Sequence, residues 1–353
     1  MQENDKTAGE VKLARTLGLG SVILLGVGAL LGGGIFTLLG PAAGMVGPGL
    51  FLSMLLGAGV AFLNLQMYIA LGTTFPDVGG GYIWIKKGLG DFQGFLAGWI
   101  SWFAHSAAAG LYAISFGFYA FELLKIVLGN DLGLNIGFIG KIFGALAVAI
   151  LGYINWKGVK TTGKTSNFIA VFLVIILLIF IIFGAVKIFS EPSESFSQFS
   201  PFLPSGILGI LAAASFFYIA FEGSEIQVQA GEETKNPKRT IKIGLFTSWA
   251  IVSALYFLIS LIIIGATRDG GPISQVLAQW GEGAIIKSAQ GFLPFGYFIM
   301  VLGGLLANLA ALNATIYSSS RVSFALARAN TIWSRLANIH FSNLPPNIAV
   351  IPS

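Results

Sequence analysis

The chain has 353 residues, of which 55% are hydrophobic and only 10% are charged, and its mean hydropathy is +0.83. Soluble globular proteins carry about 25% charged residues, so this composition indicates a membrane protein. The chain has no cysteine and two histidines, which excludes disulfides, thiolate metal sites and a histidine-rich metal centre. The net charge of +5 does not indicate a nucleic-acid partner, because the basic residues lie in loops between apolar runs, where membrane orientation explains them.

Apolar runs of about 20 residues, each long enough to cross a bilayer, divide the chain into predicted membrane spans. We expect eight, near residues 17–40, 48–72, 91–122, 136–155, 167–190, 206–229, 241–266 and 292–327. Glycines at 32–34 interrupt the first run and a small-residue cleavage site is missing, so this run is not a signal peptide. The stretch 270–290 is too polar to span, and we expect an external loop with a short surface helix there.

The distribution of Lys and Arg predicts the orientation of these spans. With the amino terminus in the cytoplasm, fifteen of the 20 Lys and Arg residues lie inside. Those outside are Lys125, Lys141, Lys187, Arg268 and Lys287. Cytoplasmic loops carry an excess of basic residues, so the sequence predicts a multi-pass protein of the cytoplasmic (plasma) membrane with a cytoplasmic amino terminus.

The first span is rich in glycine between Gly26 and Gly34. Each glycine in a helix costs about 1 kcal/mol relative to alanine, so this run favours a break in the helix. The alternative is that Gly28 and Gly32, four residues apart, simply let two continuous helices pack closely.

The sixth span carries Gly223 between two carboxylates, Glu222 and Glu225. A charge at membrane depth costs several kcal/mol, so something must compensate it. We predict a second helix break here, whose freed backbone groups must face protein, water or a ligand rather than lipid. The alternative is that both carboxylates, and Glu225 in particular, lie near the cytoplasmic boundary and are solvated.

Paired breaks five spans apart indicate an inverted-repeat transporter with a substrate site at the bilayer midplane. Freed amides attract a carboxylate, and freed carbonyls attract an ammonium group or sodium. An amino acid carries both charges, so we assign its carboxylate to the amides of residues 33–35 and its ammonium to carbonyls near Leu31, Ala220 and Phe221. With two residues of the third span, the predicted substrate site comprises Leu31, Gly32, Gly33, Gly34, Ile35, Trp102, Ser106, Ala220, Phe221, Glu222 and Gly223.

The third span places polar side chains inside the membrane. Trp102, Ser106 and Ala109 share one helix face, so Trp102 and Ser106 could line the pocket. His105 is either a hydrogen-bonded interior residue or a proton relay.

The eighth span is unusually polar. Asn308, Thr315 and Ser319 fall on one stripe, and Ser318 is a further hydroxyl of this span. Facing the carbonyls of the first span, these oxygens would complete a cage for sodium. The competing interpretation is hydrogen bonding between helices. Glu222, Glu225 and His105 are candidates for proton coupling, so the coupling ion is Na+ or H+, and no cofactor or metal site is predicted.

Four motifs follow one another along about 300 residues. They are Gly32–Phe36 (Gly-Gly-Gly-Ile-Phe), Phe75–Tyr82 (Phe-Pro-Asp-Val-Gly-Gly-Gly-Tyr), Phe221–Glu225 with the trailing Glu232–Arg239, and Ser320–Arg328. Together they resemble the prokaryotic amino acid permeases of the amino acid–polyamine–organocation (APC) superfamily. The resemblance implies an all-α, polytopic membrane protein with a five-plus-five inverted-repeat transporter fold and broken helices 1 and 6. It also implies alternating access around a pocket between spans one, three, six and eight.

The chain departs from this family in three places. Leu173 stands where some proton-coupled relatives carry a lysine, and Ala70 stands where members often carry a glutamate. The family has ten to fourteen spans, whereas this chain stops at Ser353, where a ninth would begin, so we expect a fold truncated after eight spans. The expected parts are a cytoplasmic tail (1–16), a first repeat (17–190), an incomplete second repeat (191–328) and a cytoplasmic carboxyl-terminal segment (329–353).

The sequence therefore predicts a secondary active transporter, a symporter or antiporter, for an amino acid or related amine. Its expected partners are that small molecule and membrane lipid, with no nucleic acid, and the oligomeric state is not predicted. The alternative is a membrane receptor or assembly subunit that binds an amino acid without moving it. An enzyme is not expected, because the chain shows no nucleophile–base constellation, phosphate loop or metal motif.

Overall fold

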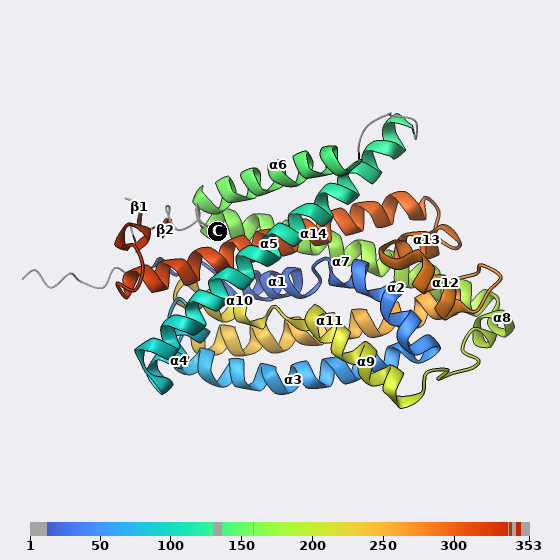
Figure 1. The fold of residues 1–353 in the computed structure, drawn as a ribbon, viewed down its shortest axis with the longest axis horizontal. Coiled ribbons are helices and arrows are strands. Elements are labelled where there is room, and N and C mark those ends of the chain that lie inside the picture. The colour runs from blue at the N-terminus through green and yellow to red at the C-terminus, as the bar shows by residue number, and fades with distance from the viewer. Residues whose placement is uncertain (1–12, 130–135, 158, 338, 341–343, 347–353) are drawn as a thin grey trace, which may run out of the picture.

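The computed structural model describes residues 13–129, 136–157, 159–337, 339–340 and 344–346. Apart from two short strands, the regular structure in these ranges is helical, which confirms the predicted all-α membrane fold (Figure 1). The predicted tail up to residue 12, and the carboxyl-terminal segment from residue 347, lie outside the described residues.

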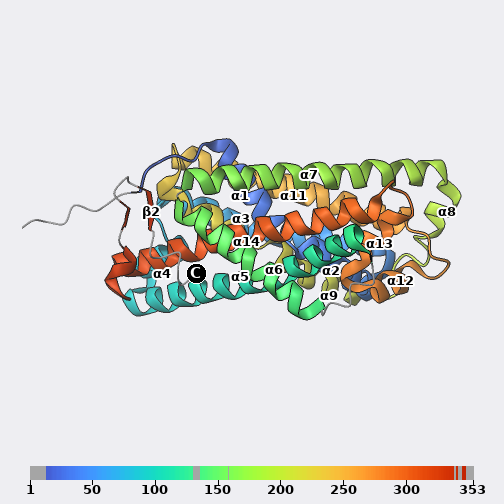
Figure 2. The same ribbon diagram turned by 90° about the horizontal axis from the view of Figure 1, so that it is seen from above.

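The long helices run along an elongated bundle, and shorter helices lie at its ends and at the helix breaks (Figure 2). They are α1 (Leu19–Leu30), α2 (Gly34–Val46), α3 (Leu50–Thr74), α4 (Gly81–Leu89), α5 (Asp91–Leu128), α6 (Ile136–Lys157), α7 (Val159–Ser190), α8 (Pro192–Ser197), α9 (Gly206–Tyr218), α10 (Ser224–Gln229), α11 (Pro237–Ala266), α12 (Ile273–Trp280), α13 (Ala284–Gln290) and α14 (Gly296–Arg328). Shorter 3-10 turns are η1 (Gly47–Gly49), η2 (Ile219–Phe221), η3 (Gly231–Glu233), η4 (Gly281–Gly283) and η5 (Ser334–Ala337). The strands β1 (Ile339–His340) and β2 (Leu344–Pro346) pair antiparallel.

The number of membrane-length helices differs from the prediction at the first span. Among the described residues, 7 helical stretches are long and apolar enough to cross a membrane, where the sequence predicts eight. The first predicted span is split into α1, of 12 residues, and α2, of 13 residues. The second half then continues through η1 into α3 as one helical run, 34–74. Each of the other seven predicted spans coincides with one helix or helical run.

Both predicted helix breaks are present. Helix α1 ends at Leu30 and α2 begins at Gly34, so residues 31–33 lie outside the helix. In the sixth span, α9 passes into η2, Glu222 then adopts an extended conformation with ψ of 112°, and α10 begins at Ser224. The glycine run and the glycine between two carboxylates therefore mark interruptions, as the sequence predicts.

The two breaks lie against each other. A Cβ atom on Gly34 would stand 3.1 Å from the Cβ of Ala220, and one on Gly223 would stand 3.2 Å from the carbonyl carbon of Ala29. Such distances are tighter than ordinary van der Waals contact, so glycine at these positions lets the two interrupted helices approach.

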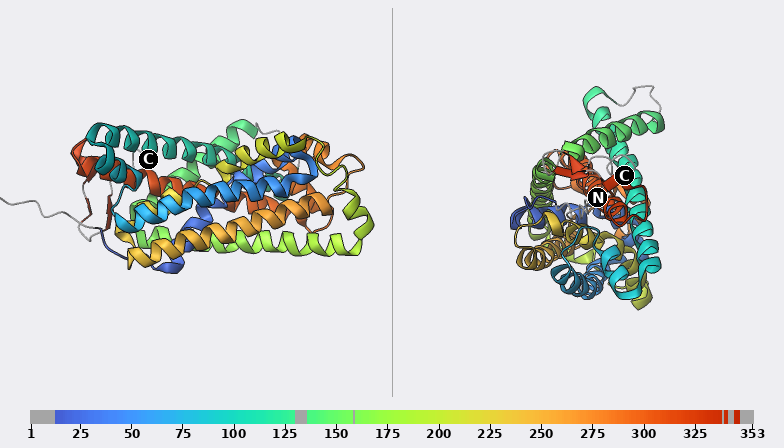
Figure 3. Two further views of the ribbon diagram at one scale, coloured as in Figure 1. Left: turned by 90° about the horizontal axis from the view of Figure 1, so that it is seen from below. Right: turned by 90° about the vertical axis from the view of Figure 1, so that its left-hand side faces the viewer.

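Helix α14 lies in the middle of the bundle, whereas α6 lies at its edge (Figure 1). In the most apolar stretch of each helix, the buried share is 72% for α14 but only 22% for α6. Helix α6 packs on α5 where two glycines meet, since a Cβ on Gly117 would lie 2.0 Å from the carbonyl oxygen of Gly140. The end-on view of Figure 3 shows α6 projecting from the rest of the bundle, so its exposed apolar face is left for lipid.

The segment 270–290 is not the surface helix that the sequence predicts. It forms two helices, α12 and α13, joined by η4, and they pack over α2. A Cβ on Gly40 would stand 2.2 Å from the Gly281 carbonyl oxygen, and Leu277 is fully buried. The prediction missed this packing because the apolar side of a short helix gives no sign of which neighbour covers it.

Candidate functional site

The glycines of the first break are enclosed on three sides. A Cβ on Gly33 would stand 2.5 Å from Oδ1 of Asn308, and one on Gly32 would stand 2.7 Å from the Cβ of Ala311. Tyr112 of α5 closes another side, 3.5 Å from the same position on Gly33. The predicted site residues of the first span therefore meet α5 and α14, and any side chain at residues 32 or 33 would collide with them.

Tyr256 of α11 connects the two breaks. Its hydroxyl donates a hydrogen bond to the Leu30 carbonyl at 2.5 Å and lies 3.4 Å from the Ala220 carbonyl. The side chain is fully buried, and its ring packs edge-on against Phe221 with the centroids 5.3 Å apart. One hydroxyl therefore lies within hydrogen-bonding distance of a carbonyl from each break, and this contact fixes the two breaks relative to each other.

Sequence reasoning missed Tyr256. Tyr256 is the single tyrosine of a largely apolar span, and only the fold brings it to the breaks. The one available signal is that a buried tyrosine in a membrane helix needs a partner for its hydroxyl.

The amino terminus of α2 has no side-chain cap among the described residues. The Gly33 carbonyl accepts the amide of Thr37 and also its hydroxyl, at 3.0 Å each. The first-turn amides of α2, which include the predicted carboxylate site, begin at this uncapped end. A helix amino terminus without a cap attracts an anion through its free N–H groups and its dipole.

The two carboxylates of the sixth span lie in different surroundings. Glu222 is exposed and lies beside Tyr218, outside the enclosed part of the break. Glu225 is half-buried, and its Oε1 accepts hydrogen bonds from the Ser101 hydroxyl at 2.8 Å and the Gln229 amide at 3.0 Å. The structure therefore brings Glu225, rather than Glu222, into contact with the third span.

Glu225 belongs to a hydrogen-bonded chain across three helices. The Ser318 hydroxyl of α14 bonds the side-chain oxygen of Gln229, which in turn donates to Glu225. On α5, Nδ1 of His105 lies 2.7 Å from the Ser101 carbonyl and 3.4 Å from the Ser101 hydroxyl. This arrangement places His105 beside Ser101, whose hydroxyl donates to Glu225, so a titratable imidazole and a carboxylate are linked through one hydroxyl.

Ser106, Ser319 and Thr315, three predicted hydroxyls of spans three and eight, bond to each other or to their own helix. The hydroxyls of Ser106 and Ser319 lie 2.9 Å apart, and the Thr315 hydroxyl donates to the Ala311 carbonyl at 2.9 Å. Trp102 lies close to this pair, because its carbonyl accepts the Ser106 hydroxyl. These contacts match the interpretation of hydrogen bonding between helices, which competes with the sodium cage.

A buried charged cluster lies where η3 meets the end of α14. Arg321 is fully buried and donates to Glu233 at 2.8 and 3.3 Å, and the Tyr317 hydroxyl donates to the same carboxylate. Arg328 donates to both oxygens of Glu232 at 3.2 and 3.0 Å. The sequence motifs contain the four charged residues, but their pairing follows only from the fold.

The segment before α1 is attached to this cluster. The amides of Thr16 and Leu17 donate to the Glu233 carbonyl at 2.9 and 3.0 Å, and the Lys235 amide donates to the Leu17 carbonyl at 2.8 Å. The Leu13 amide donates to the Glu232 carboxylate at 2.8 Å. Helices α1, α10 and α14 are therefore tied together at this end of the bundle.

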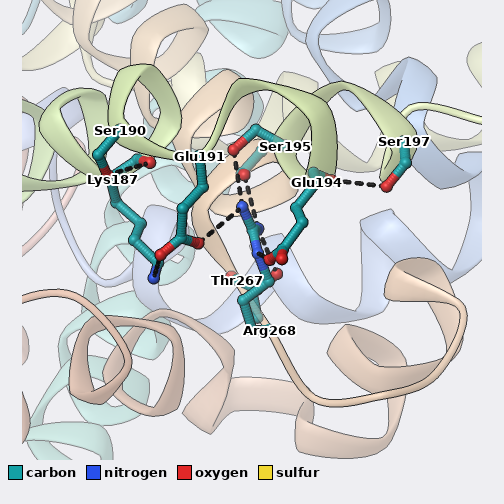
Figure 4. A network of polar contacts seen from close by, with 9 residues as sticks. Lys187, Ser190, Glu191, Glu194, Ser195, Ser197, Thr267 and Arg268 are labelled. Carbon is teal, nitrogen blue, oxygen red and sulfur yellow. Dashed lines mark hydrogen bonds and ion pairs between the residues drawn. The ribbon is translucent and has the colours of Figure 1, made fainter.

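A second charged group holds the opposite end together (Figure 4). Arg268, just after α11, lies 3.4 Å from the Glu194 carboxylate and donates to the Ser195 hydroxyl at 2.7 Å. Lys187 forms an ion pair with Glu191, which also faces Arg268 at 3.8 Å. The hydrogen bond from Lys187, with a smaller contribution from Arg268, lowers the pKa of Glu191 below its ordinary value.

Among the described residues, no group of three or more His, Cys, Asp or Glu side chains is placed to hold a metal ion. The site offers backbone amides and carbonyls, hydroxyls and amide oxygens instead. Such groups suit a small dipolar molecule or a monovalent cation.

Comparisons with known proteins agree with this architecture. The family model of the amino acid permeases matches residues 17–351. The branched-chain amino acid permease of Bacillus subtilis (strain 168) is 27% identical over 97% of this chain and 73% of its own length. The methylthioribose transporter of the same organism is 27% identical over 95% of this chain and 72% of its own length.

In three dimensions the chain is similar to a Na+-coupled sialic acid symporter in a substrate-bound, outward-open state. The TM-score is 0.64 over 97% of this chain and 74% of that chain, at 14% sequence identity, so this likeness concerns the fold alone. Because the family model matches most of the chain, the protein is a secondary transporter that belongs to the amino acid permease family.

Proposed function

We propose that this permease moves an amino acid or a related amine by alternating access, with the substrate held between the two helix breaks. The contact of the breaks supports this, because the Tyr256 hydroxyl lies within 3.4 Å of carbonyls from both. The uncapped amino terminus of α2 supplies amides at the same place. Amides for a carboxylate and carbonyls for an ammonium group together suit an amino acid.

The walls of the first break favour a substrate with an uncharged side chain. The groups nearest to the glycine positions 32–34 come from Tyr112, Ala220, Asn308 and Ala311, which carry no charge. A charged side chain would need a partner of opposite charge in this enclosed place. Glu222 is exposed in this structure and does not supply one.

Uptake of radiolabelled amino acids into vesicles that contain the purified protein tests this function. Gly33→Leu is expected to abolish uptake, because the added side chain would collide with Asn308 and fill the carboxylate site. Gly20→Leu is the matched control, since a Cβ on that exposed α1 glycine meets nothing within 4 Å. Full uptake by the Gly33 variant would contradict the proposed site.

The coupling ion is proposed to be a proton or sodium. The link between Glu225 and His105 through Ser101 supports a proton, while the oxygens of Asn308, Thr315, Ser318 and Ser319 support sodium. Collapsing the sodium gradient and the proton gradient separately in the same vesicles distinguishes the two. Uptake that is indifferent to both gradients would instead indicate exchange or facilitated diffusion.

We further propose that the protein lies in the cytoplasmic membrane with its amino terminus inside, as two repeats that begin near residues 17 and 191. The absence of cysteine makes this testable by labelling single introduced thiols. Phe196→Cys and Trp333→Cys lie at exposed positions near the two ends of the bundle. In intact cells an impermeant maleimide is expected to label the first and not the second, and the reverse result would contradict this orientation.

A receptor or assembly subunit that binds an amino acid without moving it predicts saturable binding and no accumulation in vesicles. Accumulation by the purified protein would remove this alternative. The family membership and the transporter fold do not favour it.

A further inference from the structure

Asn308 presents an unpaired oxygen deep inside the protein. Its side chain is fully buried on α14, and Nδ2 donates to the Gly304 carbonyl of the same helix at 2.7 Å. Because the nitrogen takes the helix carbonyl, Oδ1 faces away from its own turn. This oxygen accepts no hydrogen bond from the described part of the chain.

The unpaired oxygen lies directly beside the first helix break. A Cβ on Gly33 would stand 2.5 Å from Oδ1 and 3.3 Å from Cγ of Asn308. The ring of Tyr112 borders the same position at 3.5 Å. A buried side-chain acceptor without a donor therefore points at the backbone of the break.

Neighbouring groups of the chain do not supply the missing donor. The Tyr256 hydroxyl is used by the Leu30 carbonyl, and among the described residues no donor, the amides of the adjoining break included, makes a hydrogen bond to this oxygen. A buried acceptor without a donor is destabilising, and native structures keep such groups where a ligand or bound water completes them. The position of this oxygen at an uncapped helix break points to a ligand.

We propose that Oδ1 of Asn308 accepts a hydrogen bond from the ammonium group of the transported amino acid. This inference rests on the proposed function and adds a specificity-determining residue on α14 to the backbone groups of the two breaks. An amide oxygen adds no buried charge, and it accepts a stronger hydrogen bond from a charged ammonium group than from a neutral hydroxyl. The site then discriminates against molecules with the same side chain and carboxylate in which a hydroxyl replaces the ammonium.

A sodium ion is the other ligand that Oδ1 of Asn308 could bind, since an amide oxygen also binds a monovalent cation. The two sources differ in one measurable respect. If Oδ1 binds the ammonium, Asn308→Ala weakens the binding of amino acids at any sodium concentration. If it binds sodium, the variant loses the sodium dependence of binding and matches the unsubstituted protein in sodium-free buffer.

The experiment measures ligand dissociation constants by calorimetry on the purified full chain. The twenty standard amino acids are first screened singly by thermal shift, and the tightest binder is compared with the 2-hydroxy acid that has the same side chain. A hydrogen bond to a charged group corresponds to a factor of about 10 to 150 in affinity. Asn308→Ala is expected to weaken the binding of the amino acid by such a factor. The affinity for the hydroxy acid is expected to change by no more than about threefold.

Asn155→Ala is the matched control, because Asn155 is also fully buried and also has an unpaired Oδ1, but it bonds Asn313 between α6 and α14. Equal loss in this control, equal loss for the hydroxy acid, or a loss confined to sodium-containing buffer would overturn the inference. An Asn308→Ala protein that binds amino acids unchanged would overturn it while leaving the proposed function intact. If the unsubstituted protein binds no amino acid, the proposed function and the inference fail together.

Discussion

Removing Arg321 is expected to destabilise the end of the bundle that holds the buried charged cluster more than any exposed substitution does. Arg321 is fully buried, and the side chain of its partner Glu233 is only 2% exposed. The guanidinium also lies 3.9 Å from the centre of the Tyr317 ring. In Arg321→Met the Glu233 carboxylate stays buried without its cation, and breaking a buried pair in this way costs about 3–5 kcal/mol.

The free energy of unfolding, measured by denaturant titration in lipid bicelles, tests this value. Arg335→Met is the control, because Arg335 is exposed in η5, and it is expected to change the free energy by less than about 0.5 kcal/mol. The double variant Arg321→Met with Glu233→Leu removes both charges and is expected to recover most of the loss. A loss below about 1 kcal/mol in Arg321→Met alone would refute the reasoning, since it would mean that the carboxylate finds water or another partner.

Three further results are expected. Tyr256→Phe removes the hydroxyl that bridges the breaks, so uptake should fall several-fold and stability by about 1 kcal/mol, and unchanged uptake would contradict a positioning role. Gly40→Val should prevent folding, judged by gel filtration, because α12 and η4 leave no room for a side chain, whereas Gly59→Val, which meets nothing within 4 Å, should fold normally. The lowered pKa of Glu191 means that its contribution to thermal stability is present above about pH 4.3 and is lost as the pH falls through the lower folded value. Glu191→Gln should lack this acid-dependent loss, and an identical pH profile for both proteins would show that the ion pair with Lys187 does not matter.

The helix breaks could be predicted from the sequence because their causes are local. Several glycines within a few residues weaken a helix wherever it lies, and so does Gly223 between two carboxylates. The prediction of the fold class also depends only on composition and on the lengths of apolar runs. For the same reason the sequence predicts a single first span, although its two halves are each too short to span alone.

The partners of the polar side chains could not be predicted, because they depend on how the helices turn and pack. Glu222 and Glu225 are three residues apart, and the extended backbone at Glu222 turns the first outward and lets the second meet Ser101. Tyr256 reaches the breaks from a span that carries no other signal. The orientation of the Asn308 amide likewise follows from one hydrogen bond within α14.

An experimental structure with a bound amino acid tests the central claim most directly. The account predicts density between the two breaks, with the carboxylate within hydrogen-bonding distance of the Gly33 and Gly34 amides and the ammonium directed at the Ala220 and Phe221 carbonyls. Density for the amino acid at another place, with nothing bound between α1, α2 and η2, would contradict it.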